Sequence, residues 1–293
     1  MITEEMNRLI RWALEEDFGS GDVTSAAAVP AEALRKAVVV AKEPGILAGI
    51  EVAVRVFAHV DPTVRCTPML HDGDRMEQGA VVLEVEGPAR SVLGGERVAL
   101  NFLQRMCGIA TRTSEVVASL AHTSCKVLDT RKTTPGLRAF EKYAVRVGGG
   151  VNHRMGLYDM VLIKDNHVDF AGSMAAALAG VRTYLDLPGS PQVPVVVEVR
   201  SEAELAEARA ASRQLAGPDG VPLVTRYLLD NWTPEAIRPV VAARSAGEVF
   251  EASGGIEPET AVQFGETGVD FISMGWLTHS VPGLDLSMKH AAG

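Results

Sequence analysis

A dense group of positive side chains lies in the middle of this chain, between residues 126 and 166. The segment reads KVLDTRKTTPGLRAFEKYAVRVGGGVNHRMGLYDMVLIKDN. Its basic residues are Lys126, Arg131, Lys132, Arg138, Lys142, Arg146, His153, Arg154 and Lys164. The whole chain carries a net charge of −9, so this local gathering of cations runs against the overall balance. Guanidinium and ammonium groups of this kind suit a ligand with several carboxylates or phosphates.

Three of these cations stand at or shortly after the ends of short apolar runs. Arg131 and Lys132 come after the run 127–128, and Lys164 ends the run 160–163. A solvated helix face is the usual explanation of a charge run. Cations at the carboxyl ends of buried strands, however, stand where α/β barrels carry their ligand sites. The spacing therefore predicts an anion site at the rim of a barrel.

The elements that would position these residues alternate regularly from residue 124 onward. Strands are expected at 126–129, 160–164, 194–199, 226–230, 248–252 and 270–274. Helices are expected between them at 174–185, 201–215, 234–246 and 258–265, the second starting with a capping box of Ser201 and Glu204. This alternation predicts a parallel sheet with right-handed crossovers. Six clear strands fall short of the eight of a full barrel.

The first part of the chain has a different pattern. Helices are expected at 3–16 and at 91–120, the latter broken near Gly108, and the stretch 45–60 is expected to be a turn followed by a helix. Strands are expected at 34–42, 64–66 and 80–86. The stretches 17–24 and 71–79 are expected to be connecting loops, with Asp72 and Asp74 in turns. Arginines 97, 105 and 112 on the long helix are surface residues by default.

Acids and glycines complete the predicted rim. Glu198 and Asp230 end two successive strands, where carboxylates could hold Mg²⁺ beside a substrate phosphate. The sequence Ser253-Gly254-Gly255 follows the next strand, and Gly275 follows the last one. Such turns offer backbone N–H groups to a phosphate, and the last two strands are the usual phosphate position in barrels.

The composition excludes several classes of function. A hydrophobic content of 47% and a charged content of 22% are ordinary for a globular protein, and the acidic balance argues against nucleic acid as a partner. No run of 18 apolar residues and no signal peptide is visible, so we expect neither a membrane span nor secretion. The three cysteines, Cys66, Cys107 and Cys125, form no CxxC pair, which favours a cytoplasmic protein without a disulfide framework.

Several long motifs together carry a family resemblance. They are EEDFGSGDVTS, GERVALNFLQRMCGIAT, DTRKTTPGLR, EKYAVRVGGGVNHRMGLYD, LIKDNH, LLDN, EASGGI, GVDFISMG and LTHSVPGLDLS. With these motifs the chain resembles the quinolinate phosphoribosyltransferase family over nearly its whole length. It departs from the family pattern at Arg200, where many members carry an acid, and at Trp276, where a small residue is common.

The resemblance implies a fold and an assembly. We expect an N-terminal α/β sandwich domain at 1–115 and an incomplete, seven-stranded TIM-like α/β barrel at 116–279, with the tail from about 280 to 293 packing back on the first domain. It also implies a homodimer in which each barrel's site is completed by the partner's N-terminal domain. Some members assemble further into hexamers, as trimers of dimers.

The resemblance also implies roles for individual residues. Arg97 would be supplied to the partner's site, and Lys132, Lys164, Glu198 and Asp230 would be the catalytic residues. The further substrate-binding residues would be Thr130, Arg131, His153, Arg154, Ser253, Gly254, Gly255, Ser273, Met274 and Gly275. Glu198 and Asp230 would also face Mg²⁺ bound with phosphoribosyl pyrophosphate, and no organic cofactor is implied.

The implied reaction joins quinolinate to phosphoribosyl pyrophosphate and gives nicotinate mononucleotide, pyrophosphate and CO₂. Three alternatives compete with it. The nearest is a sister phosphoribosyltransferase of the same family acting on another anionic acceptor. The others are a non-catalytic anion-binding barrel, which should lack Glu198 and Asp230, and a Schiff-base aldolase using Lys132 or Lys164, which would need a desolvated lysine.

Overall fold

Two separate sheets organise the chain, which a computed structural model describes at residues 2–218 and 220–291. The first sheet belongs to a unit that comprises the residues up to Glu115, Lys132–Gly150 and those from Leu277 onward. The second sheet belongs to a unit that comprises Val116–Arg131 and Val151–Trp276. The last two residues of the expected tail, 292 and 293, lie outside the described residues.

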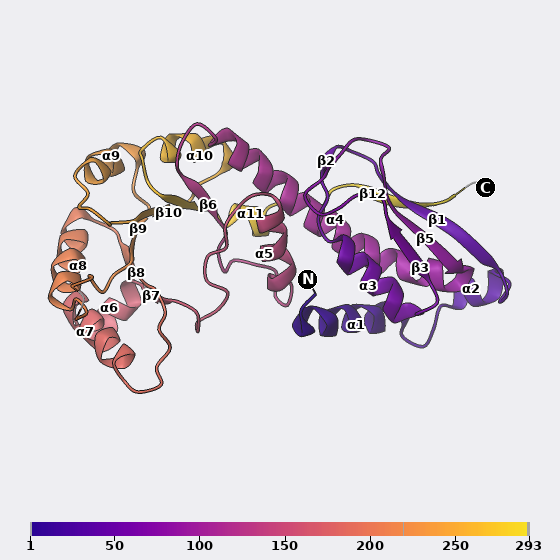
Figure 1. The fold of residues 1–293 in the computed structure, drawn as a ribbon, viewed down its shortest axis with the longest axis horizontal. Helices are drawn as coiled ribbons and strands as arrows, with labels where there is room; N and C mark the ends of the chain where they lie inside the picture. The colour runs from indigo at the N-terminus through magenta and orange to yellow at the C-terminus, as the bar shows by residue number, and fades with distance from the viewer. Residues whose placement is uncertain (1, 219, 292–293) are drawn as a thin grey trace. The chain divides into compact units, whose positions relative to one another are not determined.

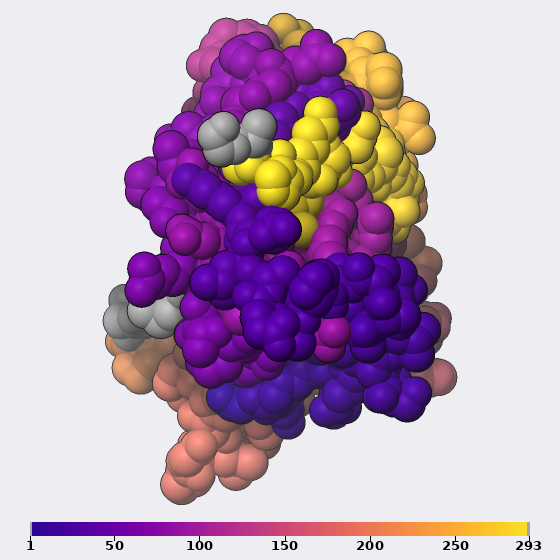
Figure 2. Space-filling view, turned by 90° about the vertical axis from the view of Figure 1, so that its right-hand side faces the viewer, coloured from indigo at the N-terminus to yellow at the C-terminus, as the bar shows by residue number. Residues whose placement is uncertain are grey.

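The first unit is built on an antiparallel sheet in the order β12-β1-β5-β3. Its strands are β1 (Leu34–Ala41), β3 (Arg65–Pro68), β5 (Val81–Pro88) and β12 (Leu286–His290). In β1 the buried residues Ala37, Val39 and Ala41 alternate with more exposed ones, as a strand with one covered face requires. Figure 2 shows the yellow C-terminal segment among the violet N-terminal residues, as the pairing of β12 with β1 demands.

Helices cover this sheet (Figure 1). The helices of this unit are α2 (Val23–Ala28), α3 (Ile50–Val60) and the start of α4 (Ala89–Ser119), together with α1 (Glu4–Phe18), which packs against α3 and α5 (Arg138–Val147). Helices α3 and α4 approach closely at Gly95, where an added Cβ would lie 2.6 Å from the ring of Phe57. The short strands β2 (Gly45–Ile46) and β4 (Arg75–Met76) pair separately. This arrangement is the predicted α/β sandwich.

Local expectations in this unit were wrong at three places. Helix α4 continues through Gly108 without a break. The glycine serves close packing instead, because a side chain at residue 108 would collide with the carbonyl oxygen of Pro282. The stretch 17–24 is not all loop, since Asp22 accepts a hydrogen bond from the Ser25 N–H at 2.9 Å and so caps α2. The loop 71–79 contains strand β4.

The second unit holds a parallel sheet in the order β6-β11-β10-β9-β8-β7. Its strands are β6 (Lys126–Leu128), β7 (Val161–Ile163), β8 (Val195–Val199), β9 (Arg226–Asp230), β10 (Phe250–Ser253) and β11 (Phe271–Ser273). Val151 adds a single parallel bridge to Leu128 on the free side of β6. That bridge occupies the place of a seventh strand, which agrees with the predicted incomplete barrel.

Helices lie along the outside of these strands in Figure 1. They are α6 (Asp165–Ala171), α7 (Met174–Leu185), α8 (Glu202–Gln214), α9 (Pro234–Ala242) and α10 (Pro258–Gly265), and α11 (Trp276–His279) follows β11. Only half of the predicted capping box forms at α8. The Ser201 hydroxyl accepts from the Glu204 N–H at 3.2 Å, but the Glu204 carboxylate accepts from the N–H of Arg200 at 2.7 Å. Buried Leu162, Val196 and Leu228 form a core cluster on three successive strands.

Candidate active site

The predicted residues of the second unit gather at one edge of its sheet. Because the strands are parallel, their carboxyl ends meet at the same rim. At or just beyond these ends stand Thr130, Arg131, His153, Arg154, Lys164, Glu198, Asp230, Ser253, Gly254, Gly255, Ser273, Met274 and Gly275. The sheet thus brings the predicted cations, acids and glycine turn of this unit to one place.

Asp129 fixes the turn that carries His153 and Arg154. Its carboxylate is fully buried at the end of β6 and accepts a hydrogen bond from the His153 N–H at 2.8 Å. The Asn152 side chain donates to its other oxygen. Because the Val151 N–H also donates to the Val127 carbonyl at 2.8 Å, the whole Val151–Arg154 turn is held beside β6.

The ring of His153 is oriented by its neighbours. Its Nδ1 accepts a hydrogen bond from the Arg154 N–H at 2.8 Å, which leaves the ring proton on Nε2. That nitrogen lies 3.5 Å from Oε1 of Glu251. The other oxygen of Glu251 accepts from Nη1 of Arg226 at 2.8 Å. Burial by itself would raise the pKa of Glu251, but His153 and Arg226 outweigh burial and lower it, so this fully buried carboxyl is ionised.

Sequence reasoning missed Glu251. It stands in an apolar strand, and its partners are 25 and 98 residues away in the chain, so no local pattern marks it. The signal that could have found it is its position two residues before the Ser253 turn, between Phe250 and Ala252 of the expected strand 248–252.

Arg154 and Arg131 are two neighbouring positive charges at the rim. Arg154 is only 8% exposed, and its Nη1 donates to the Met160 carbonyl at 3.2 Å. Burial, and then the nearby guanidinium of Arg131, lower the pKa of Arg154. Two guanidiniums held this close repel each other, and a ligand with two carboxylates would relieve that repulsion.

Lys164 and Glu198 connect neighbouring strands. Lys164 directly follows β7, and its ammonium nitrogen lies 2.5 Å from Oε2 of Glu198 on β8. The Glu198 side chain is 10% exposed, whereas that of Lys164 is 44% exposed. The lysine is therefore paired and open to solvent rather than buried in an apolar pocket.

The turn after β10 depends on two unusual backbone conformations. Asn231, just after Asp230, has a φ of 59° and donates from its backbone to the Ser253 carbonyl at 2.8 Å and from its side chain to Asp230 at 2.7 Å. Gly254 has a φ of 98°, and an added Cβ would lie 2.8 Å from the Asn231 nitrogen. Only glycine fits there. The β9 and β10 ends are thus locked together beside Asp230.

The last predicted turn is more enclosed. Met274 is 1% exposed, and its N–H donates to the Leu128 carbonyl at 3.0 Å, so this amide is hydrogen-bonded to strand β6. The Ser273 hydroxyl is buried and has no hydrogen-bond partner among the described residues. Trp276, which departs from the family pattern, begins α11 and is half-buried.

Two predicted residues belong to the first unit. Arg97 is exposed on α4, and Lys132 is an exposed residue that follows Arg131 in the chain. The expectation of a surface residue was wrong for Arg105, which pairs with the buried Glu141, whereas Arg112 is exposed and pairs with Glu115. Arg200, the other departure, is exposed between the acids Asp165 and Glu204, which neutralise it locally.

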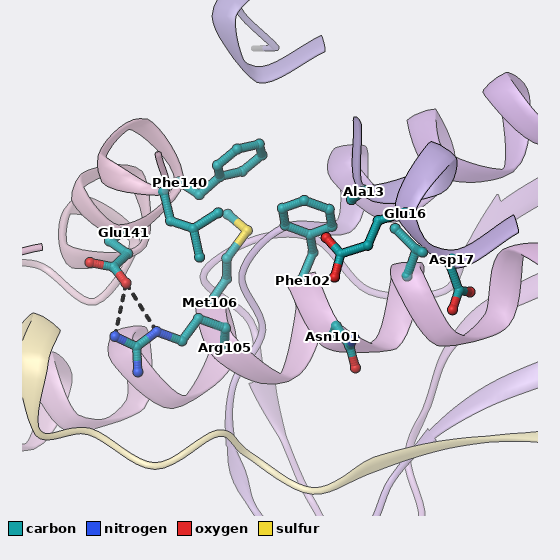
Figure 3. A pocket seen from close by; sticks show the side chains of 11 residues that line it. Ala13, Glu16, Asp17, Asn101, Phe102, Arg105, Met106, Phe140 and Glu141 are labelled. Atoms are coloured by element: carbon teal, nitrogen blue, oxygen red, sulfur yellow. Dashed lines mark hydrogen bonds and ion pairs between the residues drawn. The ribbon is translucent and has the colours of Figure 1, made fainter. Parts of the chain in front are cut away.

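A cavity of about 290 Å³ lies in the first unit. It is lined by α1, α4 and α5, with the rings of Phe102 and Phe140 beside the Arg105–Glu141 pair (Figure 3). None of the predicted site residues is among the described residues that line it. This cavity is therefore separate from the predicted chemistry.

The rim offers oxygen donors for a hard cation. Among the described residues, no three His, Cys, Asp or Glu side chains come together as a metal cluster. Mg²⁺ in phosphate-handling sites is commonly held by one or two carboxylates together with substrate oxygens. Glu198 and Asp230, at the ends of adjacent strands, fit that requirement. Within the described chain, no helix is long and apolar enough to cross a membrane.

An incomplete α/β barrel with paired guanidiniums, an exposed lysine and a glycine turn at one rim defines a protein that binds small polyanions. The family model described as quinolinate phosphoribosyl transferase, C-terminal domain, matches residues 109–289, and its N-terminal counterpart matches residues 22–107. The chain belongs to the quinolinate phosphoribosyltransferase family.

Individual relatives agree over nearly the whole chain. The chain is 43% identical to the probable nicotinate-nucleotide pyrophosphorylase [carboxylating] of Bacillus subtilis, over 97% of this chain and 93% of that protein. It is 42% identical to a quinolinate phosphoribosyltransferase [decarboxylating] of Nicotiana tabacum, over 98% of this chain and 83% of that protein. The crystal structure of NadC from Streptococcus pyogenes matches with a TM-score of 0.88 and 41% identity, over 98% of both chains.

Proposed function

We propose that this protein transfers the phosphoribosyl group of phosphoribosyl pyrophosphate to quinolinate, with loss of CO₂, to form nicotinate mononucleotide. The observation that carries the proposal is the pair of neighbouring guanidiniums, Arg131 and Arg154, at the barrel rim of a chain that belongs to this family. Quinolinate has two adjacent carboxylates, and two fixed guanidiniums match such a dianion.

In the proposed reaction the pyridine nitrogen attacks the anomeric carbon as the bond to pyrophosphate breaks. The ribose passes through an oxocarbenium-like state that a nearby carboxylate, Glu198 or Asp230, stabilises. The carboxylate beside the nitrogen then leaves as CO₂, its electron pair stays on the ring carbon next to the positive nitrogen, and a proton replaces it. The protein contributes orientation and charge, so the chemistry needs no organic cofactor.

Each predicted residue has a proposed task. Arg131, His153, Arg154 and Lys164 bind the acceptor's carboxylates, and Lys132 and Thr130 contact phosphate oxygens. The turns Ser253–Gly255 and Ser273–Gly275 hold the 5′-phosphate. Glu198 and Asp230 would hold Mg²⁺, which supplies neutralisation of the leaving pyrophosphate when it is bound.

The pairing of Lys164 argues against the aldolase alternative. A Schiff-base lysine must be neutral, which takes desolvation or neighbouring positive charge. Lys164 is instead 44% exposed, and its ammonium nitrogen lies 2.5 Å from a carboxylate, so its surroundings are not the desolvated pocket that a Schiff-base lysine needs. Glu198 and Asp230 are both present at the rim, contrary to the non-catalytic alternative.

We further infer a cytoplasmic homodimer with shared sites, in which Arg97 serves the partner's barrel, and hexamers as a further assembly. The exposure of Arg97 supports this, because its guanidinium is open to a second copy of the chain. We place the domain division near residue 115, with the tail from about 280 returning to the first domain. The two family models, which meet at residues 107 and 109, support a division in this region.

The test of the reaction is CO₂ release from carboxyl-labelled quinolinate in the presence of Mg²⁺, with and without phosphoribosyl pyrophosphate. We expect release only with the sugar phosphate, and nicotinate mononucleotide as the product. A protein that binds the sugar phosphate in calorimetry but releases no CO₂ would refute quinolinate as the acceptor.

A further inference from the structure

The segment that carries Lys132 has no regular secondary structure. Residues 129–134 lie between β6 and α5 and belong to neither a helix nor a strand. A segment without a hydrogen-bonded ladder must have its backbone groups held by other partners if its side chains are to keep a fixed direction. Two such partners are recorded around Lys132, and both belong to the first unit.

The first partner is Thr278, which is fully buried. Its hydroxyl donates to the backbone carbonyl of Lys132 at 2.7 Å. The second partner is Glu141 on α5, also fully buried, whose Oε2 accepts from the Thr134 N–H at 3.1 Å. The backbone is therefore held at Lys132 itself and again two residues later.

Arg105 on α4 joins these two partners. Its Nε and Nη2 donate to Oε1 of Glu141 at 3.1 and 2.8 Å, as Figure 3 shows. Its Nη1 donates to the Val281 carbonyl at 2.8 Å, and its Nη2 also donates to the carbonyl of Thr278. A guanidinium can serve these directions at once because its donors form a rigid fork, which a lysine lacks.

We propose that Arg105, Glu141 and Thr278, called here the Lys132 clamp, act as positioning residues that fix the backbone of Lys132 for phosphoribosyl transfer. The proposal rests on the proposed function, because it assumes that Lys132 contacts the phosphates. The clamp residues themselves need not touch the substrate. Their effect on the rate passes through the direction in which the Lys132 side chain leaves its backbone.

The test uses the full chain with Thr278→Val, which removes only the hydroxyl, and Thr278→Ser, which keeps it. Thr113→Val is the matched control, because Thr113 is equally buried in the first unit and also donates to a carbonyl at 2.7 Å, that of Ile109. We expect Thr278→Val to lower kcat about tenfold, or ~1.4 kcal/mol, with little change in the KM for quinolinate. Thr278→Ser and Thr113→Val should retain kcat within about twofold.

Two further measurements separate positioning from general stability. Hydrogen exchange of the 129–136 segment should accelerate in Thr278→Val and not in Thr113→Val. In a Lys132→Ala background, Thr278→Val should no longer change kcat, because the side chain that it positions is gone. Unchanged exchange would overturn the clamp, and a full Thr278→Val effect in the Lys132→Ala background would overturn its action through Lys132.

The same experiments distinguish this proposal from the proposed function. If the unaltered protein releases no CO₂ from quinolinate, the proposed reaction fails, and with it the assignment of Lys132. If the unaltered protein is active and Thr278→Val keeps its full kcat despite faster exchange, the reaction stands and the positioning role is refuted.

Discussion

The ammonium nitrogen of Lys164, directly after β7, lies 2.5 Å from Oε2 of Glu198 on the adjacent parallel strand β8. The Glu198 side chain is mostly buried, whereas the lysine presents nearly half of its surface to solvent. A bound anion can therefore approach the ammonium while the carboxylate remains beside it.

Glu198→Gln tests the charge of this carboxylate. The amide keeps an acceptor for Lys164 but removes the negative charge proposed to face the ribose and Mg²⁺. We expect kcat to fall by about a hundredfold, because a group aimed at developing charge is worth this much. Steady-state kinetics at saturating Mg²⁺ measures it. Glu204→Gln, in the surface pair with Arg200, is the control and should keep wild-type kinetics. A wild-type kcat for Glu198→Gln would rule out the proposed role.

Gly254 and Gly255 offer a matched pair of substitutions. Both have positive φ, 98° and 59°, but an added Cβ meets the Asn231 backbone only at Gly254. Gly255→Ala should cost about 1 kcal/mol and keep phosphoribosyl pyrophosphate binding. Gly254→Ala should displace the turn and abolish that binding in calorimetry. Equal affinities in the two variants would show that the turn does not hold the 5′-phosphate.

Glu251 should make the barrel sensitive to acid. Its pKa is lower in the folded state, so its contribution is complete above its ordinary pKa of 4.5 and is lost as the pH falls through the folded value. Glu251→Gln leaves Arg226 without its buried partner and should lower the free energy of unfolding by about 3–5 kcal/mol at pH 7.

The difference in the free energy of unfolding between Glu251→Gln and the unaltered protein should shrink as the pH falls below 4.5, the ordinary pKa of this carboxyl. Urea denaturation from pH 7 to pH 3 measures this. Glu266→Gln, which removes an exposed partner of His122, should cost less than about 1 kcal/mol. A difference that stays constant over the whole pH range would contradict an ionised Glu251.

Arg97 and Arg154 test the shared site by complementation. Arg97→Ala and Arg154→Ala should each lose roughly a hundredfold or more in kcat/KM for quinolinate, with normal melting curves. If Arg97 serves the partner's barrel, each mixed dimer contains one intact site and one site that lacks both arginines. Unfolding and refolding an equal mixture should then restore about a quarter of wild-type activity. A mixture no more active than its components would refute sharing.

The sequence predicted most of the barrel because its strands and helices are marked locally. Helices α7 and α10 begin and end where the pattern indicates, and every expected strand of the second unit forms. The local pattern did not mark the seventh position, which only the family resemblance implied, because Val151 is joined to Leu128 by a single bridge without a run of β-forming residues.

What the sequence did not predict depends on distant partners. Gly108 looks like a helix breaker, but it is needed for close packing against a segment more than 170 residues later. Arg105 resembles any exposed helical arginine until Glu141 and the carbonyls of Thr278 and Val281 are placed around it. The charges at strand ends were predictable, whereas the buried residues that orient them were not.

The pairing of β12 with β1 has a consequence for synthesis. Strand β1 is complete once residue 41 has been made, but the strand beside it is formed by residues 286–290. One edge of the first sheet must therefore stay unpaired until residues 286–290 have been synthesised. A strand that is synthesised early thus depends on one that is synthesised much later for protection from wrong strand pairing.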